Sequence, residues 1–80
     1  MRQSERPQPA LGKAIRELRQ KRGVTQETLA ADSGITGRTL SAIETGNANP
    51  TWATVGDIAA ALGVSVSELA KATERLQSQL

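Results

Sequence analysis

The chain has 80 residues, of which 38% are hydrophobic, and ten Lys or Arg against eight Asp or Glu give it a formal net charge of +2. This length suits one domain with a modest core. The sequence contains no cysteine and no histidine, which excludes disulfides, thiolate and the usual zinc sites, and histidine acid–base chemistry.

The first predicted element is a helix over residues 9–22. Pro9 suits its first turn, and Leu11, Ile15 and Leu18 recur at helical spacing. Residues 1–8 have no such periodicity, so we expect a flexible N-terminal arm. Residues 1–22 hold seven Lys or Arg against two Glu, whereas residues 23–80 hold three against six acids. This asymmetry indicates a basic end that meets a polyanion, or simply a solvated basic helix face.

Four further helices are predicted from paired stop and start signals along the rest of the chain. Glycine favours the left-handed conformation that ends a helix, and Ser or Thr caps the next one through its hydroxyl. The pairs are Gly23/Thr25, Gly34/Thr36, Gly46/Thr51 and Gly63/Ser65, and Ser65 with Glu68 forms a capping box. The predicted helices span 26–33, 37–45, 52–62 and 66–77, which leaves 78–80 as a C-terminal tail. The fold class is therefore all-α, a compact five-helix bundle occupying residues 9–77.

The helices over 26–33 and 37–45 form a predicted helix–turn–helix unit. Ser33, Gly34 and Ile35 make the turn, and Ala30 lies where the two helices should approach closely. Leu29, Ile35, Leu40 and Ile43 are expected to seal this unit onto the core. Taken alone, the unit is compatible with DNA binding or with a helical protein-interaction module.

Several segments occur in an order and spacing that closely resemble the Cro and phage-repressor type, or xenobiotic-response-element, helix–turn–helix family. They are Leu11-Gly-Lys-Ala-Ile-Arg-Glu-Leu-Arg19, Gly23-Val-Thr-Gln-Glu-Thr-Leu-Ala30, Gly34-Ile-Thr, Ile43-Glu-Thr-Gly46, Asn49-Pro-Thr and Ala59-Ala-Ala-Leu-Gly-Val64. The resemblance covers roughly residues 10–70. It implies a double-stranded DNA-binding transcriptional regulator whose helix over 37–45 lies in the major groove.

The resemblance also implies which residues face base edges: Thr36, Gly37, Arg38, Ser41 and Ala42. The first of the recognition positions on this helix, often Gln in the family, is Gly37 here and offers no side chain. Arg38 is then the only long side chain at the front of the helix, and its guanidinium suits guanine O6 and N7. The alternative role for Arg38 is a phosphate anchor.

Phosphate contacts are implied around the start of the second helix and after the third. The residues are Thr25, Gln26, Thr28, Arg19, Asn47, Asn49 and Thr51, with Gln26 as the main backbone clamp. A polar loop over 47–51 that is merely solvated is the alternative there. Arg19 and Glu44 match a family ion pair that joins the first helix to the end of the third, so we interpret both as structural, with a possible phosphate contact for Arg19.

The expected function is repression by a homodimer on a pseudo-palindromic operator, with Trp52, Leu76 and Leu80 as candidate dimer contacts. The alternative for Trp52 is packing within the monomer, and for Leu76 and Leu80 it is a frayed helix end. A DNA-binding antitoxin of a toxin pair and a helical protein-interaction module are the alternatives. Scattered carboxylates without catalytic or ligand spacing argue against an enzyme, and no cofactor or metal is expected. The N-terminus lacks a signal-like apolar segment and the longest apolar run, Ile58–Leu62, is short, so we expect a soluble, cytoplasmic protein associated with the nucleoid through DNA.

Overall fold

The computed structural model describes residues 8–79, and it contains five α-helices in that range. They are α1 (Pro9–Lys21), α2 (Gln26–Asp32), α3 (Gly37–Glu44), α4 (Trp52–Leu62) and α5 (Val66–Gln77). The all-α prediction is confirmed, and each predicted helix end lies within one residue of the observed end. Most of the expected N-terminal arm, residues 1–7, and the last residue of the expected tail, Leu80, lie outside the described residues.

Local hydrogen bonds explain why the helices begin where they do. The hydroxyls of Thr25, Thr36, Thr51 and Ser65 each accept a bond from the backbone amide three residues later, at 3.0–3.1 Å. Caps of this kind typically contribute about 1 kcal/mol each. The four glycines of the stop signals all adopt positive φ, between 70° and 81°. The start and stop chemistry expected from the sequence is therefore present at all four junctions.

The capping box at the start of α5 perturbs one carboxyl group. The backbone amide of Ser65 donates to Glu68 Oε1 at 2.8 Å, while the Ser65 hydroxyl accepts from the Glu68 amide. The bond from the Ser65 amide, and then the Ser65 side chain, stabilise the ionised form and lower the pKa of Glu68 below its ordinary value of 4.5.

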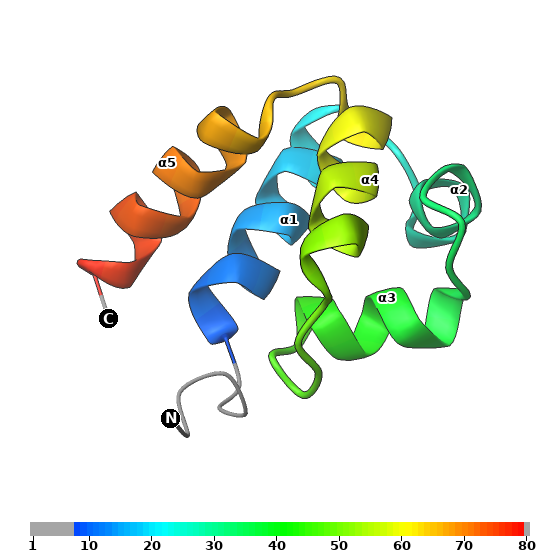
Figure 1. The fold of residues 1–80 in the computed structure, drawn as a ribbon, viewed down its shortest axis with the longest axis horizontal. Helices are drawn as coiled ribbons and strands as arrows, with labels where there is room; N and C mark the ends of the chain where they lie inside the picture. The colour runs from blue at the N-terminus through cyan, green and yellow to red at the C-terminus, as the bar shows by residue number, and fades with distance from the viewer. Residues whose placement is uncertain (1–7, 80) are drawn as a thin grey trace.

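Helix α1 is the centre of the bundle. It packs against α3, α4 and α5, and α2 packs against α3 and α4. Figure 1 shows α1 lying between α5 and α4, α3 running beneath α4, and α2 seen nearly end-on above the start of α3. Six large side chains are almost completely buried where these helices meet: Ile15, Leu29, Leu40, Ile58, Leu62 and Leu69. The core is aliphatic, as the composition requires.

No single helix among the described residues is long and apolar enough to cross a bilayer. Helices α4 and α5 taken together satisfy length and hydropathy, but a 100° bend separates them. Their apolar residues Val55, Ile58, Leu62 and Leu69 are buried in the core of the bundle.

Candidate nucleic-acid interface

The α2–α3 unit has the rigid turn that the sequence indicated. Ser33 is the C-cap of α2, Gly34 follows with a φ of 75°, and the amide of Ile35 donates to the carbonyl of Ala30 at 3.0 Å. Ala30 is itself buried, as expected of a small residue where two helices approach closely. The direction of α3 relative to α2 is thus fixed by backbone bonds and close packing.

Helix α3 has one buried face and one open face. Leu40, Ile43 and Glu44 are buried against the rest of the bundle. Among the residues expected to face bases, Thr36 and Arg38 are exposed, and Gly37, Ser41 and Ala42 are half-buried. Thr36 caps α3 and the other four residues lie within its first six positions; Thr36 and Arg38 are the exposed members of the set.

Thr36 and Gly37 have few groups available for contacts outside the protein. The Thr36 hydroxyl accepts from the Thr39 amide and donates to Thr39 Oγ1, both at 3.0 Å, so its proton is committed within the helix. The methyl group and the second lone pair of Oγ1 remain for a further contact. A Cβ built at Gly37 meets no atom within 4 Å, so this position is open space at the front of α3. Arg38 is the long polar side chain beside that space.

A buried carboxylate joins α3 to α1 and α2. Glu44 Oε2 accepts from Arg19 Nε at 2.7 Å, and Glu44 Oε1 accepts from a terminal guanidinium nitrogen of Arg19 and from Gln26 Nε2, both at 3.1 Å. The other terminal nitrogen of Arg19 donates to the Val24 carbonyl at 3.0 Å. The side chains are 13% exposed for Arg19 and 2% for Glu44. These bonds fix α3 against both neighbouring helices.

This network changes the interpretation of two predicted phosphate contacts. Arg19 uses Nε and both terminal nitrogens inside the protein and is largely buried, so its structural role is favoured over a phosphate contact. Gln26 begins α2, as expected of a backbone clamp, but its amide nitrogen points to Glu44. Gly37 offers Gln26 no side chain to contact, and Glu44 is the acceptor that Gln26 Nε2 contacts.

Gly12 contributes to the placement of α3, a role that was not predicted from the sequence. A Cβ at Gly12 would collide with the Ile43 carbonyl oxygen and lie 2.9 Å from that of Glu44. The absence of a side chain thus allows α1 to rest directly on the backbone of the last turn of α3. The available signal was an isolated glycine inside a helical pattern, which often marks a close packing contact.

The loop after α3 is organised by its own hydrogen bonds. Thr45 Oγ1 donates to the Ser41 carbonyl at 2.9 Å and accepts from Asn47 Nδ2 at 3.2 Å. Thr51 caps α4 and donates to Thr54 Oγ1 at 3.0 Å. Asn47 and Thr51 are exposed and Asn49 is half-buried. At the start of α2, Thr25 and Thr28 are likewise exposed and bonded to each other at 2.9 Å. Asn47, Thr51, Thr25 and Thr28 therefore present polar groups on the surface, whereas the side-chain oxygen of Asn49 is buried.

The three candidate dimer contacts differ in how far they are exposed in the structure. Leu76 is only 5% exposed and belongs to the core, so the expectation that it reaches a partner is wrong: α5 continues far enough along α1 to bury it. Trp52 is 76% exposed, so it is not a packing residue of the monomer. Leu80 lies outside the described residues. Within residues 8–79, no group of three or more Asp or Glu side chains is arranged to hold a metal ion.

Comparisons with known proteins agree with this geometry. A family model described as a helix-turn-helix domain matches residues 10–72. An uncharacterized HTH-type transcriptional regulator of Sinorhizobium fredii, y4dJ, is 42% identical over 64 residues, covering 80% of this chain and 83% of the relative. A second such regulator, YazB of Bacillus subtilis, is 42% identical over 59 residues, covering 74% of this chain and 86% of the relative.

Two solved structures of regulators share the fold. The clp gene regulator ClgR from Corynebacterium glutamicum is 31% identical, with a TM-score of 0.80 and coverage of 84% of this chain and 87% of that one. The restriction-modification controller protein C.AhdI from Aeromonas hydrophila is 34% identical, with a TM-score of 0.76 and coverage of 78% and 94%.

Proposed function

The chain belongs to the helix–turn–helix family of DNA-binding transcriptional regulators, and we propose that it represses transcription by binding a pseudo-palindromic operator as a homodimer. Two identical copies place their α3 helices on one face of the duplex about one helical turn, ~34 Å, apart. Occupation of the operator then blocks polymerase. A regulator of this kind acts in the cytoplasm, on the DNA of the nucleoid.

The observation that carries this proposal is the front of α3. Arg38 is exposed there beside the open position at Gly37, while the opposite face of the helix is fixed by Leu40, Ile43 and Glu44. A guanidinium held on a rigid helix suits the paired acceptors of guanine in the major groove. Ser41 adds a hydroxyl, and Thr36 and Ala42 add methyl groups that suit thymine. Specificity therefore rests mainly on Arg38.

Phosphate groups of the DNA backbone meet polar groups on either side of α3. On one side these are Thr25, Gln26 and Thr28 at the start of α2, where amides and the positive end of the helix dipole favour an oxyanion. On the other side are Asn47, Asn49 and Thr51. Lys13, Arg16, Lys21 and Arg22 on and after α1 are exposed and raise the local positive potential. Such contacts fix register and supply most of the salt dependence.

The test begins with selection of preferred sites from random DNA, which gives the operator and the spacing of its half-sites. Replacing Arg38 with Ala is then expected to cost about 1–3 kcal/mol on the selected site and to relax discrimination at one base pair, with little change in the salt slope. Arg16→Ala, an exposed arginine on α1, is the matched control and is expected to weaken specific and random DNA equally. If Arg38→Ala lowers the affinity for selected and random DNA equally, Arg38 is a phosphate contact. Selected sequences that contain a single half-site would contradict the dimer.

A further inference from the structure

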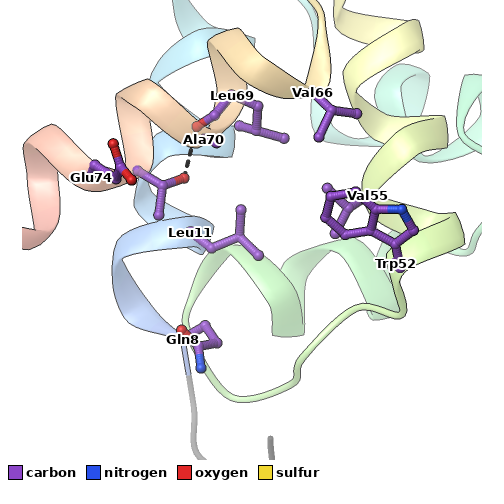
Figure 2. A pocket seen from close by; sticks show the side chains of 9 residues that line it. Gln8, Leu11, Trp52, Val55, Val66, Leu69, Ala70 and Glu74 are labelled. Carbon is purple, nitrogen blue, oxygen red and sulfur yellow. Dashed lines mark hydrogen bonds between the residues drawn. The ribbon is translucent and has the colours of Figure 1, made fainter.

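An apolar groove lies between α1, α4 and α5, away from the front of α3. Its volume is about 300 Å³, and most of its walls come from Leu11, Val55, Val66, Leu69, Ala70 and Trp52. Figure 2 shows Leu11 pointing up from α1 into the space between α4 and α5. This volume lies at the lower limit of small-molecule sites, which run from ~300 to ~1,000 Å³, and is suited to a single large side chain.

Trp52 stands at the edge of this groove. Its side chain is 76% exposed, and no other large hydrophobic side chain among residues 8–79 is exposed. An exposed aromatic residue beside an apolar depression is typical of a protein–protein contact, because tryptophan is among the strongest anchors of interfaces. The chain therefore presents, on one surface, an exposed aromatic side chain and an apolar groove that can hold such a side chain.

The chemistry of the groove matches an indole. Thr73 Oγ1 donates to the Leu69 carbonyl at 2.9 Å, so its proton is used within α5. The carboxylate of Glu74 lies on the rim, where it is exposed. An indole has an apolar body and one N–H donor that seeks an acceptor when it is buried. Apolar walls with acceptors at the edge, among them the Glu74 carboxylate and the Gln8 side-chain amide oxygen, provide for both parts.

We propose that each groove receives Trp52 of a second copy of this chain, in a two-fold symmetric contact. A two-fold interface requires the same patch on both partners, so that residue i of one contacts residue j of the other and the reverse. Trp52 lies next to the groove of its own copy, so this patch meets the requirement. A two-fold rotation that places Trp52 of one copy in the groove of the other also places the second Trp52 in the first groove. The inference rests on the proposed dimeric binding of DNA, and it names the surface that makes the dimer.

The size of this contact sets its strength. Two aromatic side chains bury about 150–250 Å² each, and the groove walls they cover add a similar area. The sum of about 600–1,000 Å² lies below the ~1,200 Å² at which stable interfaces begin. The copies therefore associate weakly in free solution and firmly only when both half-sites of one operator hold them together. The contact is measured as cooperativity on DNA.

Trp52 reports on its own burial, because it is the single tryptophan in a chain without tyrosine. Its fluorescence emission is recorded on selected DNA with two half-sites and on DNA with one of them. We expect a shift to shorter wavelength on the two-half-site DNA and an exposed-indole spectrum on the single half-site. A shift of equal size on both DNAs would overturn the proposal.

Two variants test the groove from both sides. Trp52→Ala removes the anchor, and Ala70→Glu places a charge in the groove at an exposed position of α5. Each is expected to lower affinity for the two-half-site DNA by about tenfold or more while leaving single half-site binding unchanged. Ala60→Glu, an equally exposed change on α4 outside the groove, matches the added charge and is expected to keep cooperativity. Cooperativity that survives in both Trp52→Ala and Ala70→Glu would refute the contact.

Failure of the proposed function is distinguishable from failure of this contact. If no DNA sequence is selected, the proposed function fails, and the contact is measured without DNA by sedimentation equilibrium and tryptophan emission up to millimolar protein. A dimer that shifts the emission and is abolished by Ala70→Glu would support the contact. A monomer with unchanged emission over that range would refute it.

Discussion

A methyl group at Gly12 would occupy space that the backbone of α3 already fills. The Cβ of Gly12→Ala collides with the Ile43 carbonyl oxygen and approaches that of Glu44 to 2.9 Å. Overpacking costs ~1–3 kcal/mol, and carbonyl groups of a helix cannot rotate away as a side chain can, which places this substitution at the upper end. The higher helix propensity of alanine than glycine offsets ~1 kcal/mol of this loss. The expected net loss is about 2 kcal/mol, or a Tm lower by ~8–16 °C for a domain of this size.

The measurement is thermal and urea unfolding followed by circular dichroism. Gly56→Ala is the matched control, because Gly56 also lies within a helix and its added Cβ meets nothing within 4 Å. This control is expected to gain up to ~1 kcal/mol from helix propensity. Opposite signs for the two variants separate the packing effect from the intrinsic preference for alanine. A Gly12→Ala protein as stable as the wild type would refute the close approach of α1 to α3.

Two further predictions concern carboxylates. Glu44→Ala leaves the mostly buried Arg19 guanidinium without its anion and is expected to cost up to about 3–5 kcal/mol in urea unfolding; a loss below ~1 kcal/mol would contradict the role of the network in fixing α3. Because the pKa of Glu68 is lowered in the folded state, its stabilisation is present above the unfolded value of about 4.5 and is lost as pH falls through the folded pKa. Unfolding of Glu68→Gln and wild type is therefore expected to differ at neutral pH and to converge in acid, and a difference independent of pH would contradict the capping box.

The ends of the helices were predictable because their causes are local. A cap needs one hydroxyl and an amide three residues later, and a stop needs one glycine in the left-handed conformation. Both are set within five or six residues, and Thr36 with Gly34 shows both at one junction. The C-terminal ends of α1, α2 and α3 lie one residue before the predicted ends. In each case the last residue of the predicted helix is the C-cap, which still has right-handed backbone angles.

Contacts between distant parts of the chain were harder to predict. Gly12 and Ile43 are far apart in sequence, and so are Gln26 and Glu44, so no local pattern states that they meet. The pairing of Arg19 with Glu44 was expected only from family resemblance. Leu76 looked available to a partner because the stripe on α5 gives no indication of how much of it α1 covers.

With α3 in the major groove, as proposed, the empty position at Gly37 separates the stability of this protein from the DNA sequence that it reads. No atom lies within 4 Å of a Cβ built there, and the Arg19–Glu44 ion pair that holds α3 in place is at the other end of the helix. A new side chain at this position therefore has no neighbour to displace and no core contact to lose. Libraries of substitutions at Gly37, screened against random DNA, offer a route to altered operators without redesign of the fold. In evolutionary terms, a lineage can change its target here one residue at a time while every intermediate remains folded.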